Sequence, residues 1–136
     1  MKAMIRNWMA ITGFSGMLAV ALGAFGAHGL RIWLPLQKMT IFETAVRYHF
    51  FHTFALFCTV ILLKLFPHLQ ERLRWSARLF LAGLVLFSGG LYAGVLSDVR
   101  GFMYIVPVGG LSWIVAWFWL VVVFLRWGRE GGSPAR

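Results

Sequence analysis

Acidic residues are scarce in this chain: its 136 residues include 4 Asp and Glu against 13 Lys and Arg, and charged residues make up only 12% of the sequence. Hydrophobic residues make up 60%, and the mean hydropathy is +0.78. So few polar side chains could not cover this much apolar surface in water. The composition excludes an ordinary soluble domain and indicates a membrane protein.

Cysteine is almost absent as well, because Cys58 stands alone, and this excludes a disulfide within the chain. The net charge of +9 does not indicate nucleic acid, because the basic residues lie between or outside long apolar runs. There they serve as topology signals and as contacts for anionic lipid head groups. The sequence also lacks a Gly-rich phosphate loop, a serine nucleophile elbow and a pair of intramembrane carboxylates. We therefore expect no nucleic-acid partner and favour a protein that is not an enzyme.

Long apolar runs are what the chain does have. A helix needs about 20 largely apolar residues to cross a hydrocarbon core about 30 Å thick. Three runs without a formal charge meet this length, and the run 48–63 meets it if the flanking Arg47 and Lys64 extend toward the interfaces. The sequence predicts an all-α polytopic membrane protein, a four-transmembrane-helix bundle forming one domain, 1–136. We expect spans at about 7–30, 41–66, 79–97 and 101–125, followed by a cytoplasmic tail, 126–136.

The distribution of basic residues predicts the orientation. Four spans place both termini on one side of the membrane, and nine Lys and Arg fall on that side against four on the other. The positive-inside rule then places both termini in the cytoplasm. Trp8, Trp75 and Trp127 fall on the same side, at the depth where amphipathic rings prefer to lie. We expect a multi-pass protein of the inner (plasma) membrane, with the lipid bilayer as its first partner.

Small residues recur on two of the expected spans. Close backbone approach through such residues contributes much to helix association in lipid. Gly83, Gly90 and Gly94 share one face of the third span. In the first span the small residues recur at i+4, and the stripe consists of Ser15, Ala19, Gly23 and Ala27. We expect these helix-packing faces to be close-packed, within the bundle, in a homo-oligomer or against another membrane protein.

Pro107 lies inside the fourth apolar run and is followed closely by Gly109 and Gly110. Proline removes a backbone donor, so we expect a kink or an interrupted helix start at 106–110. Such breaks mark substrate sites in some transporters, whereas in most bundles they only shape the packing.

Three histidines are among the ionisable groups expected at or near membrane depth. His28 ends the first span, and His49 and His52 are expected near the outer end of the second. His52 is expected to hydrogen-bond across the bundle to Ser88 or Tyr92, which makes His28, His52, Ser88 and Tyr92 the polar cluster of possible function. An HxxH pair could ligate a metal or haem, but it lacks the glutamate of a zinc hydrolase motif. We therefore predict no metal site and no cofactor.

Four motifs resemble those of a known family. In chain order they are ALGAFGAH at 21–28, FHT at 51–53, FSGGLY at 87–92 and PVGG at 107–110. Together they resemble the YgdD-like family of small bacterial inner-membrane proteins, which has eukaryotic relatives. The resemblance implies a four-span inner-membrane protein and implies no activity. His28 and His52 match the family pattern, whereas His49 stands where a glutamine can occur.

These observations leave three hypotheses for function. The first is a non-enzymatic protein that acts by helix association, as a homo-oligomer or an accessory subunit. The second is a redox subunit that binds haem, a metal or a quinone at His28 and His52. The third is a path for a small solute or protons past Pro107.

Overall fold

The computed structural model describes residues 2–97 and 99–129, and in this part of the chain every long element is a helix and there is no strand. Four helices are long and apolar enough to cross a membrane. The all-α, four-span class is therefore confirmed. The long helical elements are α1 (Lys2–His28), α2 (Leu36–Leu65), α3 (Gln70–Gly83), α4 (Gly90–Ser97) and α5 (Val106–Arg129).

Short helical segments join or interrupt these helices. The 3-10 turns are η1 (Leu30–Ile32), η2 (Pro67–Leu69) and η4 (Arg100–Tyr104). The segment η3 (Leu84–Gly89) is π-helical and links α3 to α4 without a break in the span. The third span is therefore α3, η3 and α4 taken together.

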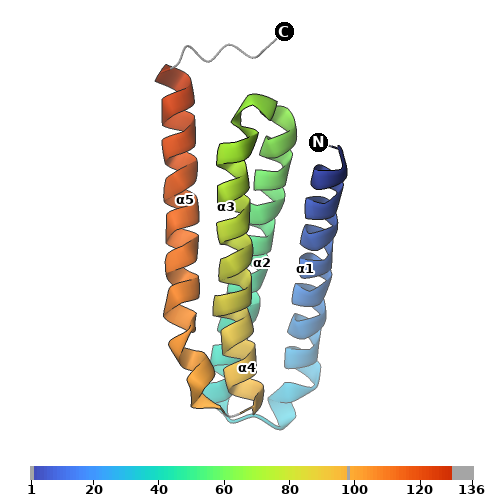
Figure 1. Cartoon of the computed structure of the whole chain (residues 1–136). Coiled ribbons are helices and arrows are strands. Elements are labelled where there is room, and N and C mark those ends of the chain that lie inside the picture. The colour runs from blue at the N-terminus through green and yellow to red at the C-terminus, as the bar shows by residue number, and fades with distance from the viewer. Residues whose placement is uncertain (1, 98, 130–136) are drawn as a thin grey trace.

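The four spans run alternately up and down, with α2 and the third span at the centre (Figure 1). α1 packs on α2, and α5 packs on the other side of the third span. The most apolar stretch of the third span is 50% buried, against 22% for α1 and for α5. The bundle is thus an open array in which α1 packs mainly on α2 and α5 packs mainly on the third span.

Two helices are longer than the uncharged runs predicted. α2 begins at Leu36, directly after Pro35, and α3 begins at Gln70, so most of the segment expected as a loop before 79 is helical. The arginines in this first part of α3 are compatible with a helix that extends beyond the hydrocarbon. Its inner face still packs, through Leu73, Ser76 and Ala77. The uncharged run therefore marks the hydrocarbon depth and not the helix end.

The residues of α1 that pack on α2 do not follow the predicted stripe, in which Ser15, Ala19, Gly23 and Ala27 are spaced four apart. Ser15 and Ala19 are buried against α2, but Ala27 is exposed and Gly26 is buried in its place. Four residues of an α-helix turn by about 400°, so a strict i+4 series rotates out of a contact after a few steps. A Cβ on Gly26 would stand 2.7 Å from Cε1 of Phe42. The contact with α2 thus needs glycine at 26.

The glycines of the third span face the fourth span. A Cβ on Gly83 would overlap the indole of Trp113, one on Gly90 would stand 3.1 Å from Val106, and one on Gly94 would stand 2.6 Å from Met103. All three small-residue positions are therefore filled from within the same chain. None of them is left as a bare surface for a second copy.

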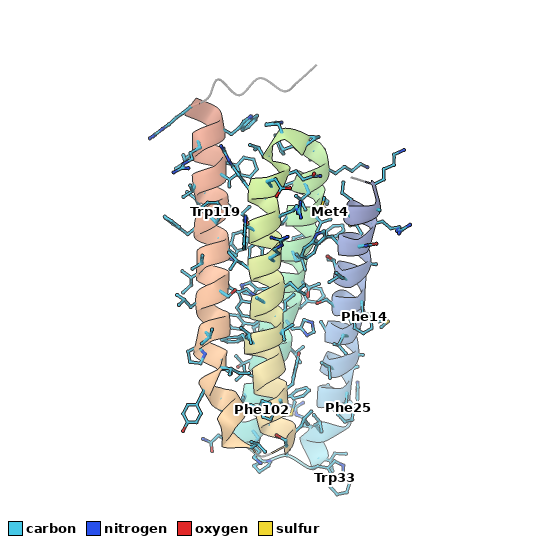
Figure 2. The ribbon with its side chains drawn as sticks, viewed as in Figure 1. Met4, Phe14, Phe25, Trp33, Phe102 and Trp119 are labelled. Carbon is cyan, nitrogen blue, oxygen red and sulfur yellow. The ribbon has the colours of Figure 1, made fainter. Side chains whose placement is uncertain are left out.

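Side chains of α5 also hydrogen-bond to the backbone of α3. The Ser112 hydroxyl donates to the Leu79 carbonyl at 2.8 Å, and the indole N–H groups of Trp113 and Trp119 donate to the carbonyls of Phe80 and Arg72 at 3.1 and 2.9 Å. Figure 2 shows Trp119 on the side of α5 that faces α3. These bonds fix the antiparallel register of the pair.

Pro107 is the second residue of α5, and the preceding segment η4 is a 3-10 turn. The first turn of a helix has no intrahelical partner for its N–H groups, so proline is accommodated there without loss. Gly109 lies against the backbone of Phe87, where a Cβ would overlap it. The interruption expected at 106–110 is thus a helix start and does not break the span at mid-depth. The last residues of the expected tail, 130–136, lie outside the described residues.

Candidate functional site

A buried polar network joins three spans near the middle of the bundle. Ser15 lies near the middle of α1, and His49 and Thr53 lie one turn apart on the face of α2 that meets it. Tyr92 reaches the network from α4. The four side chains are between 6% and 9% exposed. Polar groups at this depth are costly unless they are hydrogen-bonded, which marks the network as a candidate for function.

His49 is the centre of this network. Its Nε2 lies 3.0 Å from the Ser15 hydroxyl, and its Nδ1 lies 3.3 Å from the Tyr92 hydroxyl. Ser15 also lies 2.6 Å from the Thr53 hydroxyl. The order along the network is therefore Thr53, Ser15, His49, Tyr92.

Counting hydrogens shows that this network has one donor too many. Three hydrogen bonds join the four side chains, whereas each hydroxyl and the neutral imidazole ring carries one polar hydrogen. If Nδ1 of His49 carries the ring proton, the Tyr92 hydroxyl is left without an acceptor. If Nε2 carries it, Ser15 or Thr53 is left. A hydrogen-bond acceptor from outside the network would satisfy this donor.

A groove gives access to the network from the membrane. It has a volume of about 310 Å³ and lies between α1 and the third span, which both pack on α2. Ser15, His49 and Tyr92 line it. The walls are otherwise apolar and consist of Ile11, Phe14, Leu18, Leu81, Leu84, Val85 and Gly89. Phe14 is exposed on α1 (Figure 2), so the groove continues into the lipid-facing surface.

The structure does not gather the four residues of the expected polar cluster. Only Tyr92 belongs to the buried network. His28 is exposed at the end of α1. Ser88 is buried in the π-helical segment, and its hydroxyl has no hydrogen-bond partner within the described residues. The expected bond from His52 to Ser88 or Tyr92 is not formed.

His52 instead belongs to an aromatic stack between α2 and α5. Its Nδ1 lies 3.0 Å from the Tyr48 carbonyl one turn earlier, and its ring lies parallel to the Trp113 indole with centroids 3.6 Å apart. Tyr48 stacks on the same indole at 5.9 Å. Position 52 therefore packs α2 against α5, and position 49, about 60° away around the helix axis, carries the buried imidazole.

His49 and Thr53 are the site residues that sequence reasoning missed. The signal that could have found them is a match of two helix faces: His49 and Thr53 are spaced i, i+4, and Ser15 is the polar member of the small-residue stripe on α1. The sequence placed both histidines near the outer end of the uncharged run 48–63. α2 begins at Leu36, which places His49 near its middle.

The described part of the chain contains no candidate metal-binding site. No group of three or more His, Cys, Asp or Glu side chains there is close enough to hold a metal ion. His28 is exposed, and His49 and His52 point to different neighbours. Of these three histidines, His49 forms side-chain hydrogen bonds between spans, near the middle of α2.

Comparison with known proteins identifies the family. Residues 22–110 match a family model described as "Protein of unknown function (DUF423)". The UPF0382 inner membrane protein YgdD of Escherichia coli K12 is 36% identical over 132 residues, which cover 94% of this chain and 96% of that protein. The UPF0382 membrane protein YwdK of Bacillus subtilis is 32% identical over 123 residues, which cover 90% and 99%. No solved structure matches the chain.

The resemblance to YgdD expected from four short motifs is thereby confirmed, since the match extends over nearly the whole length of both proteins. The relatives carry names that place them in membranes, and the structure supplies four helices that can span one. The chain is therefore an integral membrane protein, and it belongs to the DUF423 family.

Proposed function

We propose that this protein is a non-enzymatic accessory subunit of the inner membrane, which receives a transmembrane helix of a different membrane protein in the groove between α1 and the third span. One observation carries the proposal: the groove is lined by Ser15, His49 and Tyr92, which belong to a network where, with a neutral imidazole, one polar hydrogen finds no acceptor among the four side chains. Polar side chains join helices in lipid in this way.

A helix suits this groove better than a phospholipid. Phospholipid head groups lie at the interface, so only acyl chains reach the depth of His49, and acyl chains carry no acceptor. A helix presents side chains at every depth, and its ridges pack into grooves between neighbouring helices. A Ser, Thr, Asn or Gln on such a helix would satisfy the surplus donor.

A second copy of this chain suits the groove less well than a different protein. The outer faces of α1 and α5 carry Met17, Ile114 and Phe118 as exposed side chains near the middle of each helix. None of these offers an oxygen acceptor. In addition, the glycines of the third span that could have joined two copies, Gly83, Gly90 and Gly94, already pack within the chain. An accessory subunit is therefore favoured over a homo-oligomer.

The orientation is part of the same proposal. Both termini lie in the cytoplasm, because nine basic residues fall on their side and four on the other. The end of α1 at Lys2 and the end of α5 at Arg129 lie at the same end of the array (Figure 1), which supports placing both in one compartment. The YgdD relative from E. coli is named an inner membrane protein.

Photocrosslinking in native membranes tests the proposal. A photoreactive amino acid at Leu18, on the groove rim, is expected to crosslink to one transmembrane helix of a different protein, at a segment that carries a side-chain oxygen acceptor. The same probe at Val121, on the outer face of α5, provides the background, since it is exposed far from the groove.

Two glycines offer a matched pair of variants. A Cβ on Gly89, which lines the groove, meets nothing closer than 3.8 Å, and a Cβ on Gly13 meets nothing within 4 Å. Gly89→Leu is expected to fill the groove and remove the Leu18 crosslink, whereas Gly13→Leu is expected to keep it. A crosslink to a second copy, to lipid alone, or to a segment without an acceptor would overturn the proposal. Equal yields from Leu18 and Val121 would overturn it as well.

A further inference from the structure

A second hollow lies between α1 and α2, nearer the turn that joins them. It has a volume of about 320 Å³, and its lining includes Arg31, Glu43 and Arg47. On the α1 side it is lined by Gly23, Gly26 and Ala27, and Phe42 and Val46 of α2 pack closely against the two glycines. This site is separate from the groove of the proposed function, which lies between α1 and the third span.

The charged residues of this hollow come from two elements and do not neutralise one another. Arg31 lies in the turn η1, whereas Glu43 and Arg47 lie one turn apart on α2. Despite their i, i+4 spacing, Glu43 and Arg47 form no ion pair in the described structure, and Arg31 forms none either. All three side chains are exposed. Two guanidinium groups and one carboxylate therefore remain available to a ligand.

The position of Arg47 makes this arrangement unusual. It lies well inside α2, twelve positions into a helix that crosses the membrane. A charged side chain in a span is costly unless it reaches the interface or meets a counter-charge. From this position the guanidinium is expected to extend toward the end of the span where Arg31 and Glu43 lie. A phosphate in that leaflet would supply the counter-charge.

A smaller hollow lies beside the first, toward the turn between α1 and α2. It has a volume of about 190 Å³ and shares Arg31, Met39 and Glu43 with the first, with Thr40 added. The residues that line the two hollows change from polar ones near the turn to the apolar residues Phe42 and Val46 farther along α2.

This order of chemistry matches one class of ligand. A phosphodiester suits two guanidinium groups, an ammonium group suits a carboxylate beside them, and an acyl chain suits an apolar recess. We propose that the hollow between α1 and α2 binds a glycerophospholipid with an ethanolamine head group. The phosphate lies between Arg31 and Arg47, the ammonium group lies at Glu43, and one acyl chain lies against the apolar lining formed by Met39, Phe42 and Val46.

Native mass spectrometry of the full-length protein tests this assignment. The protein is equilibrated with vesicles that contain equal amounts of phosphatidylethanolamine and phosphatidylglycerol, and the retained lipid is counted. The wild type is expected to retain one phosphatidylethanolamine. Arg47→Gln is expected to lower its retention about tenfold, as loss of one charge-assisted contact predicts. Lys64→Gln, an exposed charge at the other end of α2, is the matched control and is expected to change nothing.

Glu43→Gln separates the two parts of the head group. Without the carboxylate the protein is expected to keep phospholipid binding but to prefer phosphatidylglycerol. Equal retention of both lipids by the wild type would overturn the proposal, and so would an Arg47→Gln protein that behaves like Lys64→Gln. Inorganic phosphate and phosphoethanolamine are added in separate arms. Displacement of the lipid by either of them would assign the site to a free phosphate compound and overturn it.

Discussion

The indole ring of Trp113 occupies the space that a side chain on Gly83 would need. This close approach brings the Trp113 N–H within 3.1 Å of the Phe80 carbonyl and allows its ring to lie flat against His52 of α2. One glycine on α3 thus allows α5 to contact both central helices. The relationship explains why the third span is the most buried of the four.

Gly83→Ala is expected to destabilise the protein by about 1–3 kcal/mol, because the added methyl group would overpack a filled contact. The change would displace the indole and weaken its bond to the Phe80 carbonyl. Equilibrium unfolding in detergent micelles measures the loss. Gly13→Ala is the control, since a Cβ there meets nothing within 4 Å. Equal stability of the two variants would contradict the close contact between Gly83 and Trp113.

Trp119→Phe is expected to cost about 0.5–1.5 kcal/mol, the range of a hydrogen bond between membrane helices. The phenyl ring keeps much of the packing but removes the N–H that donates to the Arg72 carbonyl at 2.9 Å. Trp117→Phe provides the comparison, because Trp117 is 51% exposed and packs on Phe80 without a hydrogen bond in the described structure. The measurement is the same unfolding assay. A larger loss from Trp117→Phe would argue against the bond.

Ser15→Ala is expected to cost about 1–2 kcal/mol, because it leaves Nε2 of His49 and the Thr53 hydroxyl without their Ser15 partner in a buried site. Ser97→Ala is expected to change stability little, since Ser97 is exposed and bonds only within its own turn of the chain. Thermal unfolding of the two variants in the same detergent compares them. If Ser97→Ala costs as much as Ser15→Ala, the buried network does not stabilise the bundle.

Pro107→Ala is expected to change stability by less than about 0.5 kcal/mol, because proline in the first helical turn removes no intrahelical bond. If Pro107 instead interrupted the helix in the middle of the span, replacing it with alanine would restore a backbone hydrogen bond and raise the helix content. Circular dichroism and unfolding in micelles check the expectation. A marked gain of helix in the variant would show that Pro107 interrupts the span after all.

Labelling of single cysteines tests the orientation. Cys58→Ser removes the only thiol, and new cysteines at Gln37 and Gly128 then mark the two ends of the array. A membrane-impermeant maleimide added to spheroplasts is expected to label position 37 and to spare position 128 until the membrane is opened. The reverse pattern would place the termini outside and contradict the positive-inside assignment.

Much of the architecture follows from the sequence without any contact information. Hydropathy is a local property, so the four runs at 7–30, 48–63, 79–97 and 101–125 suffice to predict four membrane helices. The helix ends were predicted less well, because α2 and α3 extend past the hydrocarbon into residues that carry charge. The expected hydrogen bond from His52 across the bundle was wrong as well, because His49 and not His52 bonds to Ser15 and Tyr92.

The sequence by itself determined that this chain crosses a membrane four times, because burial in lipid requires only apolar length and an internally bonded backbone. Which small and polar residues meet was decided by the tertiary structure. Gly26 replaces Ala27 in the contact with Phe42, and His49 and not His52 bonds to Ser15 and Tyr92. Both outcomes depend on how far each helix is rotated toward its neighbour. That rotation is set by packing between spans and is not encoded in the pattern of any one of them.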